Sequence, residues 1–214
     1  MLEKLREPVN GITHLGAAVA SAAGLIFLVI AGRGGALKQI SLLIYGLSLV
    51  MLFSASAAYH LIRAKPGAGF TLRNIDHAAI YILIAGTYTP ICINRFTGFW
   101  QWGLLAIIWA LALAGIIARI LIDEMPRWLS ASLYLVMGWL CLAAIKQMLL
   151  FMPVPSLIWL LAGGLFFSFG AVIYAFKILD FVPDVFGYHE VWHVFVILGC
   201  LSHYLAILNL ARPG

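Results

Sequence analysis

The sequence predicts an all-α fold, a bundle of seven transmembrane helices with its N-terminus in the cytoplasm and its C-terminus outside. Of the 214 residues, 64% are hydrophobic and only 10% are charged, whereas a soluble domain averages about 45–50% apolar and about 25% charged residues. The apolar residues gather in seven segments, each near the ~20 residues that cross a bilayer core. The breaks between them are short and carry the Gly, Pro or charged residues typical of turns. We therefore expect a multi-pass protein of the cell inner (plasma) membrane.

The first apolar segment follows Lys4 and Arg6, as the core of a secretory signal does. Its twenty residues exceed the usual signal core of about 7–15, so we expect a retained helix. The next six segments follow the breaks "GRGGALK", "RAKPGAGFTLR", "NRFTGFW", "DEMPR", "MPVP" and "LDFVPDVFG". No break has room for a second folded unit, so residues 1–214 are expected to form a single domain. The predicted spans are Ile12–Ala31, Gln39–Leu61, Arg73–Ile93, Trp100–Ile122, Trp128–Leu150, Ser156–Ile178 and Tyr188–Leu210.

The orientation follows from the distribution of Lys and Arg, because cytoplasmic loops carry an excess of them. Eight fall on the side of the N-terminus and five on the other side, which places the N-terminus in the cytoplasm. The net charge of +5 then fits a surface beside anionic lipid head groups rather than a nucleic-acid site. The eight are Lys4, Arg6, Arg63, Lys65, Arg73, Arg119, Arg127 and Lys177, and the five are Arg33, Lys38, Arg95, Lys146 and Arg212.

The stretch "GYHEVWHVFVILGCLSHY" places two histidines at the head of the seventh span. His189 and His193 have i, i+4 spacing and therefore share one helix face. Ser56 and His60 have the same spacing at the end of the second span, and Asp76 lies at the start of the third. If the chain has seven spans, these three helix ends lie in the same leaflet, so the five side chains can meet at one depth.

A metal ion would explain these polar residues together, because ionisable groups inside a membrane are costly and need partners. Three neutral imidazoles, from His60, His189 and His193, plus a water molecule form an open, catalytic type of zinc site. Zinc would lower the pKa of that water to around 7. Asp76 could act on the water as a base or orienting group, and Ser56 could hold the water or a substrate carbonyl. Other divalent ions also suit this donor set.

Other interpretations of the same residues need no metal. Hydrogen bonds between helices can account for an i, i+4 histidine pair in a membrane. Asp76 could pair with Arg73 on the same helix face, and Ser56 could bond back to its own helix. A single histidine near a span end, such as His14, is usually interfacial, and the same holds for His203.

The motifs "SASAAYH", "IDHAAIYILIAGTYTP" and "HEVWHVFVILGCLSHY", with the opening "REPVNGITHLGA", resemble those of hemolysin III proteins. These are the bacterial branch of the progestin and adipoQ receptor (PAQR) family, which includes the adiponectin receptors. The resemblance implies one zinc ion near the cytoplasmic side on His60, His189 and His193, with Asp76 contacting its water and Ser56 beside it. Similarity to adiponectin receptors and alkaline ceramidases implies hydrolysis of a lipid amide.

Three functions follow as hypotheses: a zinc hydrolase of lipid amides, a sensor of membrane state with structural zinc, and a cytolysin. We favour a zinc-binding protein of membrane lipid homeostasis with the hydrolase as its activity, and keep the sensor and the cytolysin as alternatives. Membrane lipids are the expected partners, and a homo-oligomer is compatible with each function. A pore should have polar stripes along several helices. The stretch "LLAIIWALALAGIIA" at Leu104–Ala118 has no polar group except the Trp109 ring nitrogen, which disfavours a channel.

Overall fold

The computed structural model describes residues 6–122, 125–182 and 185–212. Lys4 and parts of the predicted breaks "DEMPR" and "LDFVPDVFG" lie outside these residues. Within them the chain is all-helical, as predicted, and contains no β-strand. The helices are α1 (Pro8–Ala31), α2 (Ala36–Leu61), α3 (Pro66–Arg95), α4 (Gly98–Leu121), α5 (Arg127–Trp139), α6 (Ile145–Phe151), α7 (Val154–Phe176) and α8 (Tyr188–Ala211).

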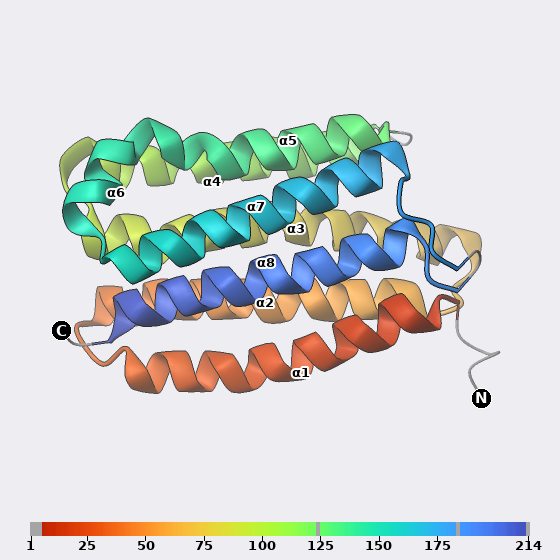
Figure 1. Cartoon of the computed structure of the whole chain (residues 1–214), viewed down its shortest axis with the longest axis horizontal. Coiled ribbons are helices and arrows are strands. Elements are labelled where there is room, and N and C mark those ends of the chain that lie inside the picture. The colour runs from red at the N-terminus through yellow and green to blue at the C-terminus, as the bar shows by residue number, and fades with distance from the viewer. Residues whose placement is uncertain (1–5, 123–124, 183–184, 213–214) are drawn as a thin grey trace.

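The helices form seven roughly parallel rods, since α5 and α6 belong to one interrupted rod (Figure 1). Each rod packs against its neighbour in sequence, and α8 closes the bundle by packing on α1. Helix α3 also contacts α5 and α8, so it occupies a central position. The rods alternate in direction, so α1 begins and α8 ends at opposite ends of the bundle (Figure 1).

Six of the described rods are long and apolar enough to cross a membrane, and α3 is not among them. Helix α3 carries polar residues such as Arg73, Asp76 and His77, together with several threonines. Its second half is almost entirely buried against other helices. A helix enclosed by protein can carry polar side chains, because they find partners there instead of lipid.

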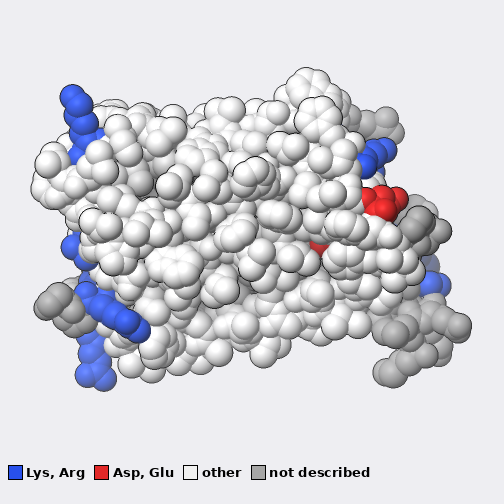
Figure 2. Space-filling model, viewed as in Figure 1, with Lys and Arg blue, Asp and Glu red and all other residues white. Residues whose placement is uncertain are grey.

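The outer surface of the bundle has the polarity of a membrane protein. On the face in Figure 2, Lys and Arg lie at the two ends, and the broad band between them is almost free of charged residues. Large apolar side chains such as Val19, Leu121, Val136 and Phe176 are more than 60% exposed. Such a surface is stable only against an apolar solvent. The chain is a multi-pass membrane protein.

Two helices differ most from the predicted spans. Helix α3 begins at Pro66 rather than Arg73, because proline fits the first helical position, where its missing N–H is not needed. The rod predicted as continuous from Trp128 to Leu150 contains a 3₁₀ segment at Leu140–Ala144. At this interruption the Tyr88 hydroxyl of α3 donates hydrogen bonds to the carbonyls of Met137 and Gly138, at 3.0 and 2.8 Å.

Candidate metal centre

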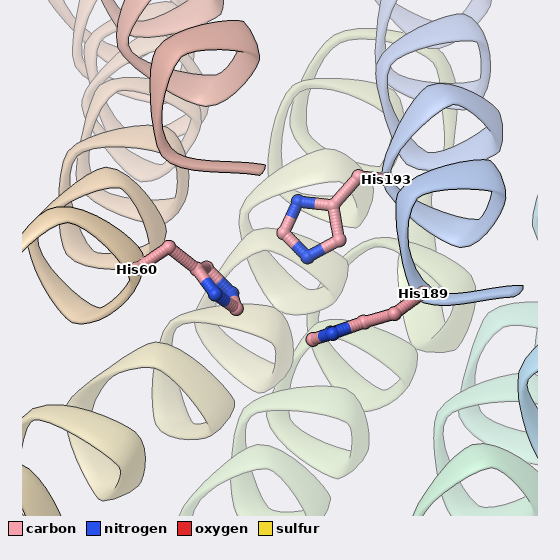
Figure 3. A group of neighbouring side chains, drawn as sticks. All are labelled: His60, His189 and His193. Atoms are coloured by element: carbon pink, nitrogen blue, oxygen red, sulfur yellow. The ribbon is translucent and has the colours of Figure 1, made fainter. Parts of the chain in front are cut away.

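Three histidines from two helices converge at the end of the bundle where α1 begins. His60 lies in the last turn of α2, and His189 and His193 lie in the first two turns of α8. In Figure 3 their rings point toward a common space. The centroid of the His60 ring is 5.1 Å from that of His189 and 4.7 Å from that of His193. One ring nitrogen of each histidine lies within 4.8 Å of the other two, so this cluster could hold a metal ion.

The start of α8 fixes the two histidines of that helix. The Glu190 carboxylate accepts a hydrogen bond of 2.8 Å from the backbone N–H of Gly187, just before the helix. This satisfies a backbone donor that the first turn leaves unpaired. Helix α8 therefore begins at Tyr188, and His189 and His193 face the bundle one turn apart.

The donor set fits a metal such as zinc. Tetrahedral zinc with Zn–N distances of about 2.0–2.1 Å requires ring nitrogens about 3.3 Å apart, a modest contraction from the observed 4.8 Å limit. His60 and His193 are only 1% and 4% exposed. Nδ1 of His193 is buried with no hydrogen-bond partner in the described part of the chain. A buried polar atom of this kind is costly unless a ligand or water satisfies it.

Ser56 and Asp76 lie beside the histidines, although they come from different helices. Ser56 is 3% exposed on α2, one turn before His60. A hydrogen bond joins its hydroxyl to the carboxyl group of Asp76 on α3. Ser56 therefore has a partner on another helix. The structure brings together all five residues that the sequence singled out.

Glu7 lies just before α1 and was not among the site residues predicted from the sequence. Its Oε2 atom is 2.6 Å from Nδ1 of His60 and 3.7 Å from Nδ1 of His189. Its backbone N–H also donates to the His60 carbonyl, at 2.9 Å. Arg6 lies 3.4 Å from the other carboxylate oxygen. Since Nδ1 of His60 is engaged by Glu7, Nε2 is the atom left for a metal. Carboxylate–histidine–metal arrangements of this type fix the ring and its tautomer.

Burial alone would raise the pKa of the Glu7 carboxyl group. The hydrogen bond to His60 and the charges of His60 and His189 outweigh burial and lower this pKa from 4.5 to about 2. Glu7 is therefore a carboxylate at neutral pH, and it places a negative charge beside the histidine cluster.

Asn10 connects Glu7 to the start of α8. Its side-chain amide donates to Glu190 at 2.7 Å and to Glu7 at 3.3 Å, and Asn10 is fully buried. Glu7, Asn10 and His14 are spaced i, i+3 and i+7 in "REPVNGITH", which places them on one helix face. This spacing is the sequence signal that could have identified them.

The expectation that His14 is interfacial was wrong. His14 is 3% exposed, and its ring centroid lies 4.0 Å from that of His193, with the rings tilted by 35°. Helix α1 packs on both α2 and α8, which encloses a side chain that hydropathy alone places near a span end. His203 is also inside the bundle, where its Nε2 atom lies 3.3 Å from the Leu160 carbonyl oxygen.

Replacing Glu7 tests its role in orienting His60. Glu7→Ala is expected to weaken zinc binding by about 10- to 100-fold, the usual effect of losing a group that orients a metal ligand. Glu7→Gln should weaken it less, since the amide oxygen can still accept the hydrogen bond from Nδ1. Competition with a chromophoric chelator would measure both affinities. Equal affinity in Glu7→Ala and the wild-type protein would contradict the assignment.

A cavity of about 180 Å³ extends from the candidate metal centre through the interior. At one end it is lined by His14, Ser56, Asp76, His189 and His193. It continues past leucines and other apolar side chains to Phe96 and Leu104, near the opposite end of the bundle. The carboxyl group and three of the four imidazoles other than that of His77 therefore lie at one end, and the rest of the lining is mostly apolar, with His203, Thr87 and Tyr88 among the exceptions.

Together the fold and the site define a class: a multi-pass helical membrane protein with a buried histidine cluster that could hold a metal ion. Residues 2–204 match the family model described as Haemolysin-III related, and the chain belongs to this family. The resemblance seen in the motifs is thus confirmed.

Similar proteins come from bacteria and from animals. The chain is 36% identical over 204 residues to the Hemolysin-3 homolog of Bacillus subtilis (strain 168), covering 94% of this chain and 92% of that protein. It is 37% identical over 212 residues to Hemolysin-3 of Bacillus cereus, covering 97% and 92%. It is 29% identical over 177 residues to the Monocyte to macrophage differentiation factor of Homo sapiens, covering 79% and 70%.

Proposed function

We propose that this protein is a zinc-dependent membrane hydrolase that cleaves an amide bond in a lipid such as ceramide and so acts in membrane lipid homeostasis. The observation that supports this most is the cavity, in which His189, His193, Ser56 and Asp76 line one end of an apolar space. In this proposal an acyl chain lies along the mostly apolar part of the cavity, and the amide bond beside it lies at the polar groups. Pockets with this division of polarity are typical of sites for amphiphilic small molecules.

His60, His189 and His193 would hold the zinc ion. When bound, it supplies a Lewis acid that polarises a carbonyl and activates water near neutral pH. Asp76 takes the proton of the attacking water as general base and passes it to the amine nitrogen as the C–N bond breaks. Ser56 donates to the Asp76 carboxylate and keeps it directed into the cavity. The products are a fatty acid and an amine.

Purified protein in detergent tests this function. We expect about one zinc per chain and turnover of a short-chain fluorescent ceramide that stops with EDTA and returns with zinc. Bound zinc without turnover of ceramides, N-acylethanolamines or other lipid amides would instead favour a sensor with structural zinc. The name of the Bacillus relatives refers to haemolysis, but the exposed apolar surface of this bundle gives no support to a polar channel.

We also propose that all seven rods cross the membrane, with the N-terminus in the cytoplasm. Helix α3 has 30 residues, long enough to span, and its neighbours bury most of its second half, including Thr87 and Thr89. Seven described Lys and Arg residues lie at the end where α1 begins and five at the other: Arg6, Arg63, Lys65, Arg73, Arg119, Arg127 and Lys177 against Arg33, Lys38, Arg95, Lys146 and Arg212.

Reporter fusions test this orientation. Alkaline phosphatase fused after Gly214 is expected to be active, and green fluorescent protein at the same position should be dark, because the C-terminus would lie outside. A fluorescent fusion without phosphatase activity would place the C-terminus in the cytoplasm and contradict the proposed topology.

A further inference from the structure

A second cavity opens beside the candidate metal centre, and its lining is basic. It has a volume of about 360 Å³ and is lined by Arg73, Arg119 and Arg127, together with tyrosines including Tyr174. We refer to this space as the basic vestibule. Asp76 is the only acidic residue in its described lining, and that carboxyl group is already bonded to Ser56. Even without Arg73, which has an interaction of its own, Arg119 and Arg127 outnumber this one carboxyl group, so the described lining carries an excess of positive charge.

The basic vestibule adjoins the apolar cavity. Five residues line both spaces: Asp76, His77, Ser130, Tyr174 and His189. Tyr174 lies between the histidine cluster and the vestibule. The centre of its ring is 5.9 Å from that of His189 and 5.6 Å from the Arg127 guanidinium carbon. A ligand can therefore have one group in the vestibule and an apolar chain beyond the histidines.

Arg119 is the residue that most requires a partner. It is only 4% exposed, and its Nε atom has no hydrogen-bond partner among the described residues. Its charge is close enough to that of Arg73 for the two to interact unfavourably. The negative end of the α4 dipole favours a cation in the last turn but leaves Nε unsatisfied. An unpaired buried charge is strongly unfavourable, so this position is suited to an anion.

Arg127 lies at the exposed side of the vestibule, and contacts with two tyrosines fix its side chain. Arg127 donates to the Tyr188 hydroxyl at 2.6 Å, and its guanidinium carbon lies 5.6 Å from the centres of the Tyr174 and Tyr188 rings. These contacts fix the planar guanidinium while leaving donors on its other edge. Arginine presents such donors in the fork geometry that matches phosphate oxygens.

We propose that the basic vestibule is a phosphate-binding site, in which Arg119 and Arg127 bind the phosphate of an anionic lipid or inorganic phosphate. The vestibule lies at the end of the bundle, at the level of lipid head groups if the rods span the membrane. Anionic lipids are concentrated at the cytoplasmic surface. A lipid phosphate in the vestibule would place its acyl chain in the apolar cavity. This site does not depend on hydrolysis, so it can be present even if the proposed reaction is wrong.

The test compares Arg119→Gln with Lys65→Gln in purified, zinc-containing protein. Lys65 is exposed at the same end of the bundle and does not line the vestibule, so its replacement removes an equal charge outside the site. The ligands are dioctanoyl phosphatidate, its uncharged counterpart dioctanoylglycerol, and inorganic phosphate, each titrated calorimetrically. Zinc is measured on every sample, because a bound metal also attracts phosphate.

We expect wild-type protein and Lys65→Gln to bind a phosphate ligand with affinities within about twofold, and Arg119→Gln to bind it about 10- to 100-fold more weakly, as for the loss of charge-assisted hydrogen bonds. Arg119→Lys keeps the charge but loses the forked pair of guanidinium donors, so its affinity for the phosphate ligand should lie between those of the wild-type protein and Arg119→Gln. Tight binding of phosphatidate alone identifies the lipid head group as the source, and equal binding of inorganic phosphate identifies the free ion.

Thermal unfolding gives a second readout. The shift in melting temperature on adding ligand is compared within each variant, so it remains informative when a variant is less stable than the wild-type protein. Phosphate ligand should raise the melting temperature of the wild-type protein by mass action and leave that of Arg119→Gln unchanged. Absence of saturable binding in the wild-type protein would overturn the proposal. Equal affinity in wild type and Arg119→Gln, or equal binding of dioctanoylglycerol, would overturn it as well.

Discussion

Replacing His189 and His193 together with alanine is expected to abolish zinc binding. The two residues supply two of three imidazoles in the cluster, and His60 alone forms one bond to a metal. Structural zinc sites bind with free energies of about 10–16 kcal/mol spread over four ligands, so the loss of two ligands leaves no stable site. Elemental analysis should fall from about one zinc per chain to background, and lipid amide turnover should disappear with the metal.

The control for this prediction is His203→Ala, which removes a histidine from the same helix. His203 contacts the Leu160 carbonyl and is not part of the metal-competent cluster, so this variant should keep its zinc. Wild-type protein without metal under mild purification, or full zinc content in the double variant, would contradict the site. The histidines would then be packing residues, as the alternative interpretation of their spacing holds.

Asp76→Asn is expected to keep the metal and lose the reaction. Asparagine retains the size of the side chain and can still accept the hydrogen bond from Ser56, but it cannot take a proton from water. General-base catalysis contributes about 10²- to 10⁴-fold, or about 2.7–5.5 kcal/mol of the barrier. We therefore expect kcat to fall by that factor at unchanged zinc content, measured on a fluorescent ceramide with zinc analysis of the same sample.

Ser56→Ala tests whether Ser56 positions the Asp76 carboxyl group without taking part in the reaction itself. It removes only the hydroxyl that bonds to Asp76, so kcat should fall about 10-fold, as for one hydrogen bond to a charged group. If Asp76→Asn also lost its zinc, Asp76 would be a metal ligand instead of a base. If Asp76→Asn turned over substrate at the wild-type rate, the proposed mechanism would be wrong.

The helical class, the approximate helix limits and the five residues of the candidate site could be predicted from the amino-acid sequence alone. Hydropathy predicts membrane helices reliably, because a backbone in lipid must satisfy its own hydrogen bonds and a span needs a fixed length. The i, i+4 spacings of His60 with Ser56 and of His189 with His193 place each pair on one face. An even number of spans between the N-terminus and each of these helix ends then places them on the same side.

The tertiary structure decided which helices are neighbours and which residues beyond the motifs take part. Helix α1 lies between α2 and α8, so Glu7 reaches His60 across 53 positions of the chain and His14 is buried against His193. From the sequence, Arg119 is one of several basic residues near the span ends. In the structure, packing at the end of α4 buries it. Hydropathy and helical spacing report only on a single helix and its solvent. Contacts between helices depend on packing and hydrogen bonds between distant segments, and these positioned Glu7, His14 and Arg119.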